Sequence, residues 1–208
     1  MNHVVIAHYD FPLDWINKIT TDKAVAIIYS ASKPHEFEPL SIPKHFARNK
    51  GMDASMYLSY IIDHYNELPE RTLFVHHHEE NWTQDYPLPF IINNLNWNAA
   101  KYFSIGNRKM YVNPYSSISN EHQQIIKDNW YIFQGNIEHT ENIFFYCGTQ
   151  FCVHRDLILQ YPVTFYKGLL NWVYETPLAD YYTGRMFEYY WHYLLTHDPV
   201  DNDIKYLL

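Results

Sequence analysis

The chain has 208 residues, of which 47% are hydrophobic and 18% are charged, and its formal net charge is −8. This composition is that of a globular protein and excludes a disordered chain, and the length allows one core without disulfides or metal staples. The 15 Lys and Arg residues form no basic patch, so sequence-independent binding of nucleic acid is not expected.

The two cysteines, Cys147 and Cys152, form neither a CxxC motif nor a disulfide framework, which indicates a reducing compartment and a cytoplasmic protein. The N-terminus has a short apolar stretch without a basic leader, which predicts a strand rather than a signal peptide. No apolar run approaches the roughly 20 residues that a membrane span needs, so no span is expected.

A β-α-β unit is expected at the start of the chain. Apolar runs predict strands at His3–His8 and Ala24–Tyr29, and the spacing of apolar residues predicts a short helix over Leu13–Thr20 between them. Such units almost always build parallel sheets.

A second unit of the same kind follows. Residues 31–50 hold three prolines and predict a long irregular connection, which leads to a helix over residues 53–66 with Asp53 as its N-cap. Thr72–His76 is the next expected strand. The two units predict an α/β protein with a central, mostly parallel mixed sheet flanked by helices.

The second half of the chain is less regular, and residues 83–120 give no clear pattern. A helix is expected over residues 119–133, and strands at Ile143–Tyr146 and Thr149–Val153 are expected to pair across Gly148. Further helices are expected over residues 154–162, 165–175 and 184–195.

The segment TLFVHHHEENW, residues 72–82, places three histidines and two glutamates behind an expected strand. Because alternate side chains of a strand share a face, His76 and His78 are expected to point together, with Glu79 or Glu80 turning in beside them. Imidazole and carboxylate suit Mn²⁺, Fe²⁺ or Zn²⁺ better than Mg²⁺. The alternative is a solvated loop in which one histidine caps the strand. Ligands of open α/β sheets bind at the carboxyl ends of the strands, so both interpretations, a ligand site and a solvated loop, are retained.

Common catalytic motifs are absent, namely GxGxxG, GxxxxGK[ST] and GxSxG, and HEENW has Trp82 where a zincin HExxH needs its second histidine. In GRMFEYYWHYLL, Glu188 and His192 are four residues apart and share a helix face, where they could supply a general base and a metal ligand. For this segment alone, a surface pair on an amphipathic helix is the simpler interpretation.

Two further segments are suited to a ligand. In CGTQFCVHRD, Gly148 lies two residues before Gln150 and allows either close approach of a ligand or a plain turn between strands. In HFARNKG, Arg48 and Asn49 precede a helix N-terminus and are candidates for contact with a diphosphate or a base. The alternative there is an exposed basic loop.

Three segments together resemble a known family: NKGMDASMYLSYIIDHYNELPERTLFVHHHEENW, GTQFCVHRDLILQYPVTFY and GRMFEYYWHYLL. They look like the family called domain of unknown function 3431, and the resemblance covers residues 49–195 with the spacings in order. The order of elements is also similar to that of nucleotide-sugar glycosyltransferases of the GT-A fold. A further resemblance is to the capsid-glycan glycosyltransferase domains of large algal viruses.

The resemblance implies a single GT-A-like domain over residues 1–208, with a nucleotide-binding half at 1–82 and an acceptor and sugar half at 83–208. GT-A enzymes hold Mn²⁺ or Mg²⁺ with an Asp-x-Asp motif, and this chain departs from that pattern because His76–Glu80 stands at the matching place. The implied cofactor is Mn²⁺ or another divalent metal, since Mn²⁺ accepts imidazole. The implied ligands are His76, His78, Glu79 and His192.

The resemblance also implies roles for the other candidates. The implied contacts to nucleoside and diphosphate are Ala7, His8, Tyr9, Asp10, Arg48 and Asn49. The implied sugar and acceptor side is Gly148, Thr149 and Gln150, and the implied catalytic carboxylates are Glu188 and Glu80. The implied function is metal-dependent transfer of a sugar from a UDP-sugar donor to a glycan or protein-linked acceptor. The alternatives are a metal-dependent phosphoester hydrolase and a non-enzymatic carbohydrate-binding module.

Overall fold

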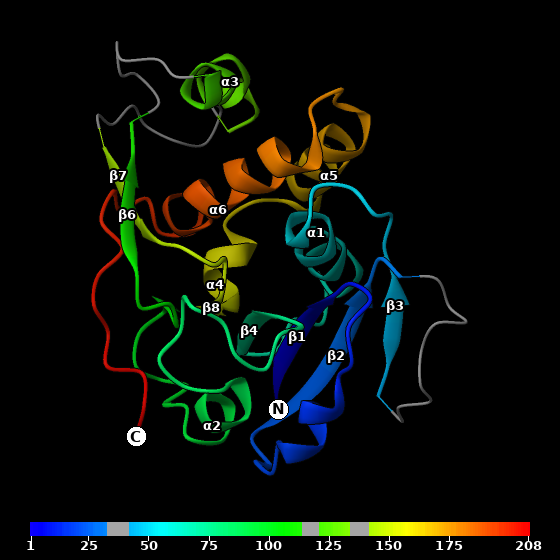
Figure 1. The fold of residues 1–208 in the computed structure, drawn as a ribbon, viewed down its shortest axis with the longest axis vertical. Helices are drawn as coiled ribbons and strands as arrows, with labels where there is room; N and C mark the ends of the chain where they lie inside the picture. Colours follow the sequence, from blue (N-terminus) through cyan, green and yellow to red (C-terminus); the bar gives the residue numbers. More distant parts are fainter. Residues whose placement is uncertain (33–41, 114–120, 134–141) are drawn as a thin grey trace.

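The computed structural model describes residues 1–32, 42–113, 121–133 and 142–208. Its central strands are β1 (Asn2–His8), β2 (Ala24–Ser30), β3 (Lys44–Phe46), β4 (Arg71–His76), β5 (Tyr102–Ser104) and β8 (Phe151–His154). They form one sheet in the order β3-β2-β1-β4-β8-β5 (Figure 1). The pairs β1–β2, β1–β4 and β2–β3 are parallel, and β8 runs antiparallel to both of its neighbours. The expected α/β architecture with a mostly parallel mixed sheet is confirmed.

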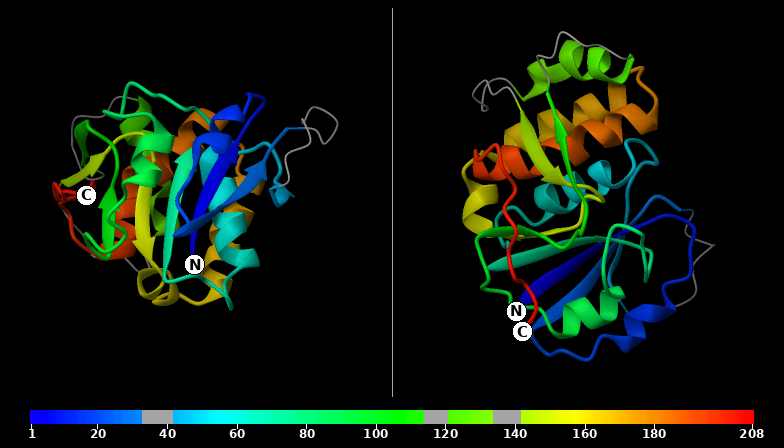
Figure 2. Two further views of the ribbon diagram at one scale, coloured as in Figure 1. Left: turned by 90° about the horizontal axis from the view of Figure 1, so that it is seen from below. Right: turned by 60° about the vertical axis from the view of Figure 1, so that its left-hand side comes forward.

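Helices cover both faces of this sheet (Figure 2). The helices α1 (Asp53–Asp63), α5 (Val163–Glu175) and α6 (Asp180–Thr196) lie on one face, and the 3-10 helix η1 (Asp14–Lys18) and α2 (Leu88–Asn93) lie on the other. Successive side chains of a strand point to opposite faces, so β1 serves two cores. Val5 and Ala7 join the core under α1, whereas Val4 and Ile6 join the core under α2.

A small second sheet stands beside the main one. It pairs β6 (Lys109–Val112) with β7 (Ile143–Tyr146), and α3 (Glu121–Asn129), the 3-10 helix η3 (Trp130–Ile132) and α4 (Arg155–Leu159) complete the described elements. The expected pairing of the two strands across Gly148 is therefore wrong. The β7 strand alternates buried and half-buried residues, which suits a two-stranded sheet, whereas β8 begins with three buried residues, which suits an inner strand between β4 and β5.

Other expectations differ in detail. The helix expected over residues 13–20 is the short 3-10 helix η1, and the helix expected over 154–162 is the five-residue α4. The connection over 31–50 contains β3, and residues 33–41 of it lie outside the described residues. The first two residues of the helix expected over 119–133 also lie outside them. Within the described part of the chain, no helix combines the length and apolar character needed to cross a membrane.

Candidate functional site

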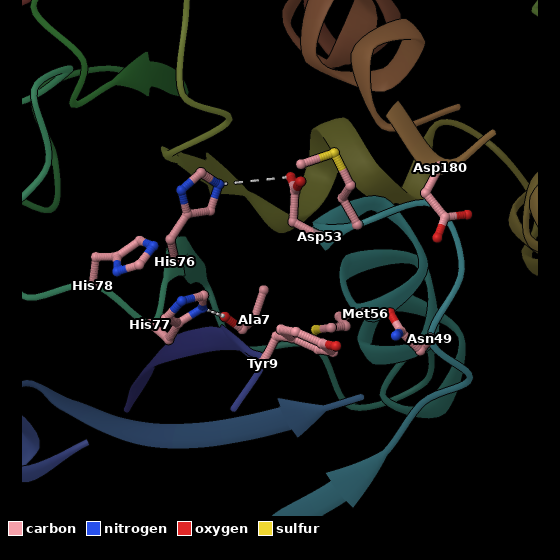
Figure 3. Close-up of a pocket in the computed structure, with 10 residues that line it drawn as sticks. Ala7, Tyr9, Asn49, Asp53, Met56, His76, His77, His78 and Asp180 are labelled. Carbon is pink, nitrogen blue, oxygen red and sulfur yellow. Dashed lines mark hydrogen bonds and ion pairs between the residues drawn. The ribbon is translucent and has the colours of Figure 1, made fainter. Parts of the chain in front are cut away.

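A cleft opens where the carboxyl ends of β1 and β4 meet (Figure 3). The chain runs from β1 to β2 and β3 on one side and then crosses to β4 on the other, so strand order reverses here. Ligands of open α/β sheets bind at such switch points. The cleft has a volume of about 390 Å³, and its walls come from the ends of β1 and β4, the start of α1 and the start of α6.

The loop after β1 is held in place by side chains that face away from the cleft. His8 is buried, with Nδ1 2.9 Å from Ser30 Oγ and Nε2 2.8 Å from a carbonyl oxygen of the loop. Burial lowers the pKa of His8, so its ring is neutral at pH 7. Asp10 adopts a φ of 51° and its N–H donates to a serine hydroxyl. Of the four consecutive residues from Ala7 to Asp10 that were expected to contact the donor, Ala7 and Tyr9 line the cleft.

The N-terminus of α1 borders the cleft. Gly51 and Met52 enter the helix with φ values of 76° and 55°, and no side chain caps it. The first N–H groups of an uncapped helix are a favourable place for an anion. Asp180 Oδ1, at the start of α6, accepts a hydrogen bond from the Gly51 N–H at 3.3 Å, which ties the two helix ends together.

Asp53 and His76 face each other across the cleft (Figure 3). Asp53 Oδ2 lies 3.9 Å from His76 Nε2, and both atoms are buried without a hydrogen-bond partner. The backbone N–H of His76 donates to Gln150 Oε1 at 3.1 Å, so the end of β4 is anchored to the start of β8. Buried polar atoms are normally hydrogen-bonded, and these two lack hydrogen bonds although they lie within ion-pair distance of one another, which makes the space between them a candidate place for a ligand.

His77 and His78 complete the far wall. His77 Nδ1 lies 3.2 Å from the carbonyl oxygen of Ala7, and its ring stacks on Phe11 with centroids 4.6 Å apart. Burial, followed by the nearby charge of His78, lowers the pKa of His77 to about 3. His76 and His78 both line the cleft, and His77 lines it as well, with its ring centroid 3.9 Å from that of His78. The reason is that β4 ends at His76, so strand alternation stops there.

The expected metal set of His76, His78, Glu79 and His192 is not assembled. Lys18 Nζ binds Glu79 Oε1 at 2.6 Å, and His192 lies in the core, 4% exposed, with Nε2 3.1 Å from Thr196 Oγ1. Burial lowers the pKa of His192 to about 4. Among the described residues, no group of three or more His, Cys, Asp or Glu side chains is placed to hold a metal ion.

Glu188 has both carboxylate oxygens engaged. Its Oε1 accepts a hydrogen bond from the Gly148 N–H at 2.8 Å, and its Oε2 forms an ion pair with Arg185. Gly148 has a φ of 100°, and a Cβ there would lie 2.6 Å from Thr83 Oγ1, so this turn accepts glycine alone without strain. Glu188 therefore positions the turn before β8, whereas Glu80, the other expected catalytic carboxylate, is exposed on the loop after β4.

The other candidates divide between the cleft and the scaffold. Asn49 lines the cleft, whereas the guanidinium of Arg48 turns to Glu175, 3.9 Å away at the end of α5. Gln150 is 3% exposed and its Nε2 donates to Gln84 Oε1 at 2.9 Å, which makes it a structural link between loop and sheet.

Sequence reasoning treated Asp53 as a helix cap and missed it as a cleft residue. The structure makes Met52 the capping position, and the Asp53 side chain turns to His76. The available signal was that the start of a β-α-β helix and the end of the following strand meet at the same sheet edge.

A comparison with curated proteins found no match. The model of one protein family matches residues 4–205, nearly the whole chain, and it is the family that the three sequence segments indicated. The chain therefore belongs to the family described as Protein of unknown function (DUF3431).

Proposed function

We propose that the protein is a metal-dependent glycosyltransferase. It binds a UDP-sugar in the cleft between β1 and β4 and transfers the sugar to a glycan or protein-linked acceptor. The observation that carries the proposal is that Asp53 Oδ2 and His76 Nε2 face each other at the switch point of the sheet, both buried and both without a hydrogen bond. The similarity of element order to GT-A enzymes supports a nucleotide-sugar donor, and the similarity to viral capsid-glycan domains supports a glycan acceptor.

The pair suits a divalent cation. Two ligand atoms about 2.1 Å from one ion lie at most about 4.2 Å apart, and these two atoms lie 3.9 Å apart. One carboxylate and one imidazole suit Mn²⁺ and leave further coordination positions for diphosphate oxygens. A bound cation would act as a Lewis acid that neutralises charge on the leaving diphosphate.

The remaining walls suit the other parts of the donor. The uncapped first turn of α1 favours phosphate oxygens, and Tyr9, 46% exposed, offers an aromatic face to the base or sugar. Glu80 is the carboxylate assigned to the acceptor hydroxyl proton, because both oxygens of Glu188 are engaged. Cys147 and Cys152 are free thiols, which supports a cytoplasmic location.

Calorimetric titration of UDP with and without Mn²⁺ tests the proposal. The wild type is expected to bind UDP in the presence of Mn²⁺, and Asp53→Asn or His76→Gln should each weaken this binding by about tenfold or more. His64→Gln is the matched control, because His64 lies at the other end of α1 and contacts Glu67 there. Equal heats with and without Mn²⁺, or full UDP binding by both cleft variants, would remove the proposal.

A further inference from the structure

Two further cavities follow the cleft along residues 76–87. The cleft shares His77 and His78 with a second cavity of about 250 Å³ beside the loop after β1. This second cavity shares Glu80 with a third of about 450 Å³, which is lined by residues between Glu80 and Pro87. Neighbouring cavities share lining residues, so the three lie in a row along residues 76–87, which we call the track, and this arrangement suits a chain-like ligand.

The loop that forms the outer end of the track is fixed from inside. Gln84 Nε2 donates to the carbonyl oxygens of Glu79 at 3.1 Å and Tyr86 at 2.9 Å, which closes the loop on itself. Gln84 Oε1 accepts a hydrogen bond from Gln150, the residue before β8, and both glutamines are buried. A loop fixed in this way presents its outward side chains in one arrangement and lowers the entropic cost of binding.

Two of the side chains that this loop turns outward are aromatic. Trp82 is 68% exposed and Tyr86 is 46% exposed. The guanidinium carbon of Arg108 lies 5.0 Å from the centroid of the Trp82 ring, so one face of the indole is held while most of the ring stays in water. Tyr86 stacks on Phe90 with centroids 5.0 Å apart. Both Trp82 and Tyr86 line the third cavity, so they offer aromatic faces to a ligand there.

The polar groups around these rings select the kind of ligand. Glu80, Asn81 and Asp85 line the same cavity and provide oxygens that accept hydrogen bonds from hydroxyl groups. Flat aromatic faces pack against the apolar C–H faces of sugar rings. The two carboxylates repel polyanions such as nucleic acid.

We infer that the track from His78 to Tyr86 binds an oligosaccharide, with Trp82 and Tyr86 as its stacking platforms. Its role as the acceptor subsite rests on the proposed transferase function, because the track begins at the donor cleft and ends at the aromatic loop. The binding itself requires neither metal nor nucleotide, so it can be tested separately.

Trp82 also provides the signal for the experiment. It is the only exposed tryptophan of the six, all of which lie within the described residues. A ligand that covers Trp82 should therefore reduce quenching of tryptophan fluorescence by acrylamide. The probes are neutral gluco-, xylo- and manno-oligosaccharides, from single sugars to hexasaccharides, added to the whole protein without metal or nucleotide. Protection is expected from at least one series and should increase with chain length.

Variants distinguish saccharide binding in this track from nonspecific binding elsewhere on the surface. Tyr86→Ala, followed by fluorescence, and Trp82→Ala, followed by calorimetry, should each weaken saccharide binding by about tenfold. Tyr131→Ala is the matched control, because Tyr131 is 57% exposed on η3, outside the track. Saccharide binding without Mn²⁺-dependent UDP binding would support the saccharide track and remove only its acceptor role. No protection by any saccharide, or equal weakening by Tyr131→Ala, would overturn the inference.

Discussion

Replacing Gly51 by alanine is expected to lower the free energy of unfolding by about 2–5 kcal/mol. Gly51 enters α1 with a φ of 76°, a conformation that costs a residue with a Cβ about 1–2 kcal/mol. The added Cβ would also collide with Cγ1 of Val173, a fully buried residue of α5, and overpacking of this kind costs about 1–3 kcal/mol. The neighbouring Asp53 should shift with the helix start, so Mn²⁺-dependent UDP binding should weaken as well.

Urea unfolding followed by circular dichroism measures this change, and an unchanged m value would show that stability alone has altered. Gly168→Ala is the matched control. Gly168 lies inside α5, and a Cβ there meets no atom within 4 Å, so alanine should stabilise the protein by about 0.5–1 kcal/mol. A Gly51→Ala protein as stable as the wild type would refute the reasoning, because it would show that the entry to α1 relaxes without cost.

Two further predictions concern buried carboxylates. Glu188→Gln should lower the free energy of unfolding by about 1–3 kcal/mol, because the charged side chain holds Gly148 and pairs with Arg185. Loss of sugar transfer with an unchanged urea midpoint would instead identify Glu188 as a catalytic base. Burial raises the pKa of Asp201 from 3.8 to about 6, so the folded state binds this proton more tightly than the unfolded state. Stability is therefore lost as pH rises from 3.8 to about 6, by about 3 kcal/mol in total. Urea unfolding gives the free energy of unfolding of Asp201→Asn minus that of the wild type at each pH. This difference should be about 3 kcal/mol larger at pH 7.5 than at pH 3.5. A difference that does not change with pH would contradict the prediction.

Elements that depend on local pattern were predicted well. The strands β1, β2 and β4 are continuous apolar runs, as expected for strands buried on both faces, and α1 and α6 show clear helical periods. The three-residue strand β3 was missed because it lies among prolines and exists through its pairing with β2. The partner of β7 was predicted wrongly because nearness along the chain was taken for nearness in the sheet.

The candidate site divides in the same way. A strand of apolar residues followed by histidines was enough to place His76 at the carboxyl edge of a parallel sheet, because the direction of a strand follows from β-α-β connections. The side chains around His76 are determined by how the helices pack on the sheet. Asp53 meets His76 because α1 lies across β1 and β2, whereas Glu188 meets Gly148 and His192 enters the core. Helical spacing defines which side chains share a face, but the elements packed against that face decide what those side chains contact.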